Sequence, residues 1–166
     1  ESGADSSFDE APLTDGGEGF CEILTRAAGG QLRECPVRGP RYEDARAPLG
    51  IVEARALPAG VIARLGIEQN GLLAVIEMAR ASGLQDVPPE HRDPWQTTTW
   101  GTGDLIAAAA AAGANAALIG IGGSATNDAG TGALQALGLR CEDAAGNHLA
   151  PATPATWDTI ARLDGQ

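Results

Sequence analysis

Residues 116–137 read AALIGIGGSATNDAGTGALQAL, and this stretch decides the fold class. Apolar and small residues fill positions 116–121, which predicts a strand of small residues. A turn of glycine and polar residues follows, and a helix is expected from there to Leu137. A strand, a glycine-rich turn and a helix in this order are typical of an α/β protein with some parallel strands.

Outward from this unit, apolar runs bounded by glycine and proline predict further elements. Residues 20–28 have helical periodicity and end at Gly29-Gly30, which can stop a helix. We also expect strands at 32–37 and 51–57, an exposed loop at 39–50, and a helix at 105–112 that Thr102 could cap. The apolar run at 72–78 could be a buried strand or the start of a helix, and we favour the strand. The predicted fold is therefore α/β, with a mixed sheet and flanking helices.

The composition excludes several functional classes. The 166 residues carry 22 acidic and 11 basic side chains, a net charge of −11, and the sequence contains no lysine. A phosphate-binding Walker lysine, a Schiff base and a lysine general base are therefore impossible within this chain. An anionic surface disfavours nucleic acid and anionic membranes as partners, and no apolar run is long enough to span a bilayer.

Cysteine and histidine usage indicates a cytoplasmic protein without a structural metal. The three cysteines, Cys21, Cys35 and Cys141, are an odd number without C-x-x-C spacing, which favours reduced thiols. His91 and His148 have no further ligand at metal-binding spacing. The acidic N-terminus also lacks the basic and apolar regions of a signal peptide.

The turn at residues 120–130 is a candidate anion site, because a glycine-rich turn between a strand and a helix presents free backbone N–H groups. Its candidate contacts to phosphate or carboxylate are Gly122, Gly123, Ser124, Thr126 and Asn127. Asp128 is the only carboxylate in the turn. It could accept a proton from a substrate hydroxyl or hold Mg²⁺, and the alternative is that Ser124, Asn127 or Asp128 simply caps the following helix.

Other polar segments are candidates of the same kind. In the turn at 15–19, Asp15, Gly16, Gly17 and Glu18 could meet a divalent cation or substrate hydroxyls, or the turn could merely be solvated. Thr98, Thr99 and Thr102 could bind a ligand, or serve ordinary turn and capping roles.

Glu77 interrupts the apolar run LLAVIEM at 72–78. Burying a carboxylate without partners costs several kcal/mol, so we expect Glu77 to face a cleft or to be paired. Arg80 is the expected partner if the chain turns helical there.

A dinucleotide-binding domain is an alternative, because Gly120-x-Gly122-x-x-Ala125 fits the fingerprint of that fold. Glu142 and Asp143 follow about 20 residues later, where a ribose-binding carboxylate would lie. Against this alternative, the first glycine lies within the apolar strand and the turn carries Asp128. We therefore expect no dinucleotide binding.

Four motifs in one order resemble the bacterial glycerate kinase family. They are PLTDGGEG at 12–19, VIEMARASGL at 75–84, RDPWQTTTWGTGDLI at 92–106 and IGIGGSATNDAGTGALQALG at 119–138. The resemblance covers most of the chain and implies ATP-dependent phosphorylation of glycerate to a phosphoglycerate. One departure is Ala129, which stands where the family has glycine.

The resemblance also implies two α/β domains with a cleft between them, and a chain that is truncated at both ends. Residues 1–30 would be a remnant of the first domain, and residues 31–166 would be the second, inserted domain with the turn at 120–130. The partners would be glycerate, ATP and the missing remainder of the polypeptide. The isolated chain would then have little or no kinase activity.

Carried onto this sequence, the resemblance makes Asp128 the base that takes the hydroxyl proton. The glycine-rich turn would position phosphate or glycerate, and Asp15 and Glu18 would approach the same cleft. Mg²⁺ would accompany ATP, with Asp128 and Asp15 as candidate ligands. The alternative within the same fold is a non-catalytic domain that binds a small acid or another protein.

Overall fold

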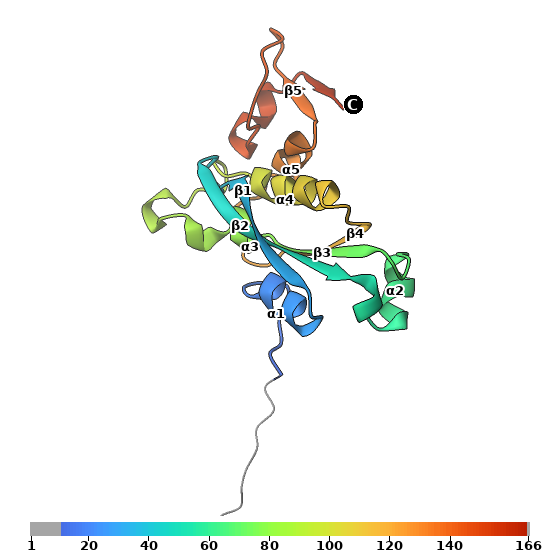
Figure 1. Ribbon diagram of the computed structural model, residues 1–166. Coiled ribbons are helices and arrows are strands. Elements are labelled where there is room, and N and C mark those ends of the chain that lie inside the picture. The colour runs from blue at the N-terminus through green and yellow to red at the C-terminus, as the bar shows by residue number, and fades with distance from the viewer. Residues whose placement is uncertain (1–10, 166) are drawn as a thin grey trace, which may run out of the picture.

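The computed structural model describes residues 11–165, which form a four-stranded mixed sheet with helices on both faces (Figure 1). The strands are β1 (Gln31–Arg38), β2 (Asp44–Glu53), β3 (Leu72–Glu77) and β4 (Ala116–Gly120), in that spatial order. β1 pairs with β2 and β2 with β3 in antiparallel fashion, whereas β3 and β4 are parallel. The predicted α/β class with a mixed sheet is confirmed.

The central strand β3 is buried on both faces, which explains its unbroken apolar run. Ala74 and Ile76 lie in the core cluster that includes Leu105 of α4 (Trp100–Ala111). Leu73 and Val75 belong to a second cluster with residues of α1 (Phe20–Ala27) and α2 (Ala59–Leu65). Successive side chains of a strand point to opposite faces, so one short strand supports both halves of the core.

Short elements complete the main body. α3 (Ala79–Ser82) follows β3 directly, and α4 then carries the chain to β4, the kind of long crossover that parallel strands require. Four 3₁₀ turns lie at Ala54–Ala56, Leu84–Asp86, Pro89–His91 and Pro154–Thr159.

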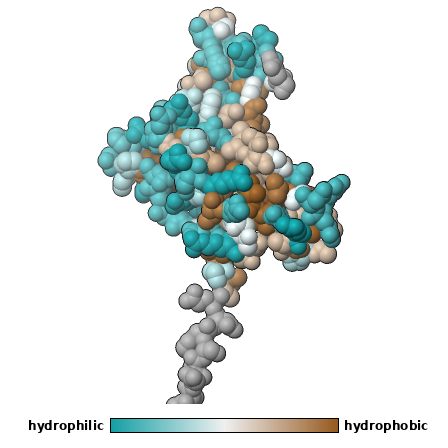
Figure 2. Space-filling model, viewed as in Figure 1, coloured by the Kyte–Doolittle hydropathy of each residue, from teal (hydrophilic) through white to brown (hydrophobic). Residues whose placement is uncertain are grey.

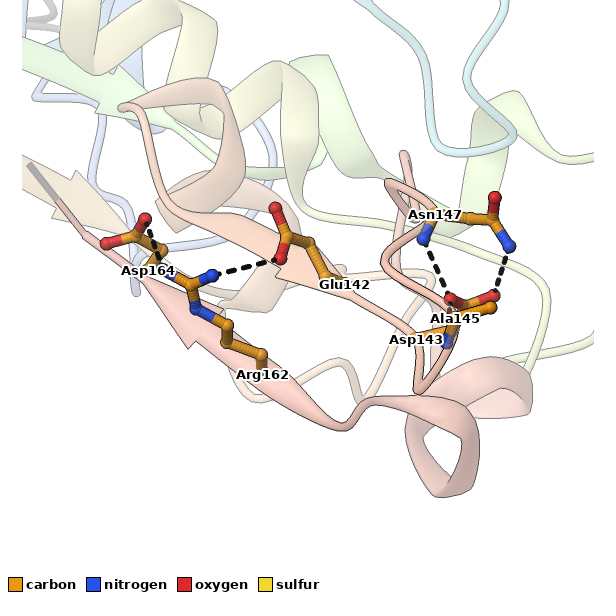
Figure 3. A network of polar contacts seen from close by, with 6 residues as sticks. All are labelled: Glu142, Asp143, Ala145, Asn147, Arg162 and Asp164. Atoms are coloured by element: carbon orange, nitrogen blue, oxygen red, sulfur yellow. Dashed lines mark hydrogen bonds and ion pairs between the residues drawn. The ribbon is translucent and has the colours of Figure 1, made fainter.

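The C-terminal part extends away from the main sheet (Figure 1). It contains α5 (Thr131–Ala136), which contacts α4, and a two-stranded antiparallel sheet of β5 (Arg140–Glu142) and β6 (Arg162–Asp164). Arg162 forms ion pairs with Glu142 and Asp164 (Figure 3), and the N–O distances are 3.6 Å and 3.3 Å. These solvent-accessible ion pairs contribute at most about 1 kcal/mol each, and only the Arg162–Glu142 pair joins the two strands, so the register depends mainly on the backbone pairing.

Asp143 closes the turn that follows β5. Its carboxylate accepts hydrogen bonds from the side chain and backbone of Asn147 and from the backbone N–H of Ala145 (Figure 3). The Asn147 side chain is the largest cause of a lowered Asp143 pKa, because it stabilises the ionised carboxylate.

The predicted helix at 20–28 and the predicted strands at 32–37 and 72–78 are confirmed. The prediction of an exposed loop at 39–50 is wrong. β2 begins at Asp44 and runs through most of that range. Its first half carries Arg46 and Pro48, so local composition hides it. The strand forms because Ala47 and Leu49 are buried against the helices and because β2 pairs along β1.

Two further expectations are wrong. The strand at 51–57 ends at Glu53, and the helix α2 that follows was not predicted. Thr102 does not cap α4, because the helix begins at Trp100 with Thr99 in the preceding position. Instead the Thr102 hydroxyl lies 3.0 Å from that of Ser82, inside the core between α3 and α4.

Within residues 11–165, no helix combines the length and the hydropathy needed to cross a bilayer.

The fold predicts a large difference in thiol reactivity. Burial raises the pKa of the Cys21 thiol to about 11 and also raises the pKa of the Cys35 thiol, but Cys35 is only half-buried on the edge strand β1. Iodoacetamide at pH 8 should therefore label Cys35 first, and all three cysteines should react after unfolding. Mass spectrometry of timed samples measures this order. Equal labelling rates for Cys21 and Cys35 would contradict the packing of α1.

Candidate active site

Three of the motif segments converge at the carboxyl ends of β3 and β4. The Met78 N–H donates to the Gly120 carbonyl at 2.9 Å, and the Gly122 N–H donates to the Gly16 carbonyl at 2.9 Å. The Leu84 N–H donates to the Gly123 carbonyl, also at 2.9 Å. The turn at 15–19, the segment after β3 and the turn after β4 thus form one surface, at the edge of a sheet where α/β proteins commonly bind ligands.

Glycine is required at this junction because the backbones approach closely. A Cβ atom built on Gly120 would lie 2.7 Å from the Gly16 carbonyl oxygen and 2.7 Å from the Phe20 ring. A Cβ on Gly122 would lie 2.7 Å from the Gly17 Cα. The glycines of the 120–125 turn therefore have a packing role against the 15–19 turn, beside any role toward a ligand.

Glu77 ties the turn at 15–19 to the end of β3. Its side chain is 1% exposed, and its two oxygens accept hydrogen bonds from the N–H groups of Gly19 and Cys21, each at 3.1 Å. A carboxylate at the start of α1 also interacts favourably with the helix dipole. The expectation that Glu77 is paired is confirmed, but its partners are backbone groups of α1 and not Arg80.

A cleft of about 500 Å³ opens beside Glu77. Its charged lining residues are Glu18, Glu22, Glu34, Glu77, Asp86 and Arg80. Gln85 also reaches across it and donates to Glu18. Five carboxylates against one guanidinium make this cleft strongly acidic.

Asp128 is 1% exposed and lies among donors. Oδ2 accepts from the Thr99 N–H at 2.8 Å, the Gly132 N–H at 3.0 Å and the Thr99 hydroxyl at 2.9 Å. Oδ1 accepts from the Gly130 N–H at 3.0 Å. The Thr98 hydroxyl lies 3.4 Å from Oδ2.

These contacts make Asp128 a joint cap for two helices. Thr99 immediately precedes α4, and Gly130 and Gly132 lie at the start of α5. The structure thus brings Thr98 and Thr99 to Asp128, away from the cleft beside Glu77. The anion at the start of α5 is the protein's own carboxylate, so that helix end has no free N–H groups at Gly130 and Gly132 for a phosphate.

A second pocket, of about 240 Å³, lies beside the glycine-rich turn. Ser124, Thr126 and Asn127 line it, together with Arg92 and Asp93. The Thr126 hydroxyl donates to the Thr97 carbonyl and the Ser124 hydroxyl to the Thr126 carbonyl, which fixes the wall of the pocket. We call this space the turn pocket.

Arg92 is the residue of this pocket that the sequence reasoning missed. It is the first residue of the motif RDPWQTTTWGTGDLI. It is also one of only 11 arginines in a chain that has no lysine and a net charge of −11. An arginine at the start of a family motif, in a chain this acidic, was the sequence feature that could have indicated a binding residue for an anion.

The candidate metal ligands do not form a metal centre. Within residues 11–165 no group of three or more His, Cys, Asp or Glu side chains could hold a metal ion. The oxygens of Asp128 are already occupied by donors. Asp15 is exposed, and its Oδ1 accepts from the Gly17 N–H at 3.2 Å.

The dinucleotide alternative lacks its ribose contact. Asp143 is used in closing its own turn, and Glu142 pairs with Arg162 in the small sheet. Asp128 also takes the place beside α5 where a pyrophosphate would have to lie.

Known proteins similar to this chain agree with the four motifs. A glycerate kinase from Bacillus subtilis is 46% identical over 149 residues, 90% of this chain and 34% of the relative. A glycerate 2-kinase from Escherichia coli is 45% identical over 145 residues, 87% of this chain and 34% of the relative. The chain therefore spans about a third of the length of these relatives.

The fold gives the same result. A crystal structure assigned to glycerate kinase 2 of Salmonella typhimurium LT2 superposes with a TM-score of 0.74 and 44% identity, covering 92% of this chain and 36% of the other. The profile of the glycerate kinase family matches residues 1–166. From its sequence and its fold, this chain belongs to the glycerate kinase family.

Proposed function

We propose that this chain is part of an ATP-dependent kinase that phosphorylates glycerate, and that the surface at the ends of β3 and β4 binds the substrates. The observation that carries the proposal is the convergence of residues 15–19, 77–84 and 120–125 at that surface. These segments lie far apart in the sequence, and each belongs to a motif of the family.

The remaining partner is the rest of the same polypeptide. The relatives are about three times longer than the matched segment, so a complete enzyme would include two thirds of its length outside these 166 residues. We therefore expect the isolated chain to have little or no activity, and we place the reaction in the cytoplasm. The division of this segment at residue 30 into parts of two domains stays a prediction.

The chemistry requires alignment and charge neutralisation more than covalent help from the protein. Within the part of the chain that the structure describes, the N–H groups of Gly123 and Ser124 make no hydrogen bond. Gly123 has a φ of 72°, which exposes such groups in a glycine-rich turn. They support contact between this turn and phosphate oxygens of ATP or of the product.

Mg²⁺ is expected with ATP, but the described residues do not form a site that fits it. Asp15 is the remaining candidate ligand on this segment, because Asp128 is enclosed by donors. Asp128 stays the proposed base for the hydroxyl proton, and its carboxylate accepts hydrogen bonds from the N–H groups of Thr99 and Gly132 in this structure.

The test uses the full-length enzyme, meaning a polypeptide of the relatives' length that contains these 166 residues. We expect glycerate-dependent formation of ADP from ATP, abolished by EDTA and restored by excess Mg²⁺. Glycerol, which has hydroxyls but no carboxylate, is the control substrate. Binding of glycerate without ADP formation would instead support the non-catalytic acid-binding alternative.

A further inference from the structure

The two concave surfaces beside the glycine-rich turn differ in charge. The cleft beside Glu77 carries five carboxylates and one arginine, which disfavours an anion that binds without an accompanying cation. The turn pocket carries one arginine and one aspartate, Arg92 and Asp93, among neutral donors. A small carboxylic acid therefore meets less repulsion in the turn pocket than in the cleft.

Arg92 lines the turn pocket with an exposed side chain. Its Nε donates to the Val87 carbonyl at 3.0 Å, which fixes one edge of the guanidinium. Among residues 11–165, no carboxylate lies within ion-pair distance of Arg92, and its two Nη groups make no hydrogen bond. An anchored guanidinium with free Nη groups is suited to binding a carboxylate through two parallel hydrogen bonds.

The other walls of the turn pocket fit a small polar acid. Leu84, Val87 and Pro94 provide apolar surface, and Asn127 adds an exposed amide. The volume of about 240 Å³ is below the range of roughly 300–1,000 Å³ typical of sites for drug-sized ligands. The space therefore suits a three-carbon acid better than a nucleotide.

We infer that Arg92 binds the carboxylate of glycerate in the turn pocket, with Asn127 beside it, and that this contact sets the preference for a hydroxy acid over a neutral polyol. The inference rests on the proposed function and adds to it a specificity-determining residue outside the glycine-rich turn. The glycerate hydroxyls would then point toward the turn at 120–125, where the phosphate is expected.

The experiment compares Arg92→Met, Arg92→Lys and the control Arg41→Met in the full-length enzyme. Methionine keeps the apolar stem without the charge, and lysine keeps the charge without the planar fork. Arg41 is exposed and lines neither pocket. We expect KM for glycerate to rise roughly 10- to 100-fold in Arg92→Met, because charge-assisted hydrogen bonds are lost.

In the same variant, KM for ATP and kcat should each change by less than about threefold. The reason is that the lost contact would stabilise bound glycerate equally in the ground state and in the transition state. Arg92→Lys should recover part of the affinity, and Arg41→Met should match the wild type. An unchanged KM for glycerate in Arg92→Met would overturn the inference. A rise confined to KM for ATP would also overturn it, because Arg92 would then serve the nucleotide phosphates.

Failure of the proposed function has a different signature, namely a wild-type enzyme without glycerate-dependent ADP formation. Calorimetric titration with glycerate then still tests Arg92. Binding that Arg92→Met weakens supports the inference. Equal binding by both proteins, or no binding by the wild type, overturns it.

Discussion

Replacing Asp128 with asparagine is expected to lower the melting temperature of the chain by roughly 10 °C, equivalent to about 3–5 kcal/mol of stability. Both carboxylate oxygens accept backbone N–H groups, from Gly130 at Oδ1 and from Thr99 and Gly132 at Oδ2. Whichever oxygen becomes the NH₂ group of asparagine, a donor then faces a buried donor. The helix starts of α4 and α5 lose their common cap.

Asp158→Asn is the matched control, because Asp158 is exposed and the same chemical change there should shift the melting temperature by less than about 2 °C. Thermal melts followed by circular dichroism measure both variants. An Asp128→Asn protein that melts like the wild type, and whose full-length form loses kcat about 100-fold, would contradict the capping role and support Asp128 as the catalytic base.

Replacing Glu77 with glutamine should loosen the turn at 15–19 and destabilise the fold by about 2–3 kcal/mol. The carboxylate accepts from Gly19 and Cys21 with one oxygen each, and glutamine keeps only one acceptor at this buried position. Hydrogen exchange at these two amides should accelerate at least about tenfold, because local opening of the turn becomes easier.

Glu68→Gln provides the comparison, since Glu68 is exposed and its side chain makes no hydrogen bond within the described residues. Exchange is followed by NMR or by mass spectrometry of peptides that cover residues 15–24. If Glu77→Gln leaves the exchange of the Gly19 and Cys21 amides unchanged, Glu77 does not hold the turn, and the site is organised by the glycine contacts alone.

The elements that the sequence predicted well are those whose pattern is local. The helix at 20–28 has apolar residues at helical spacing, and β3 is an apolar run buried on both faces. β2 could not be predicted in its first half, because Arg46 and Pro48 disguise a strand that is formed by pairing with β1. Tertiary pairing therefore overrode local composition there.

In the candidate site, too, the features that depend on local sequence could be predicted, and those that depend on tertiary contacts could not. The sequence flagged Glu77 because a carboxylate inside an apolar run requires a partner, but nothing local indicated that its partners are N–H groups 56 and 58 residues away. Asp128 stood out as the charged residue of its turn, whereas its enclosure by Thr99 and Gly132 depends on how α4 packs on α5. Ala129 was noted as a departure from glycine, and it adopts a φ of 51°.

The central claim is that these residues form the substrate-binding part of a glycerate kinase, and a segment exchange tests it most directly. The segment of the Bacillus subtilis glycerate kinase that matches this chain, at 46% identity, is replaced by the corresponding residues of this chain. We expect a chimera that melts cooperatively and forms ADP from ATP only when glycerate is present. A cooperatively folded chimera without glycerate-dependent ADP formation would contradict the account.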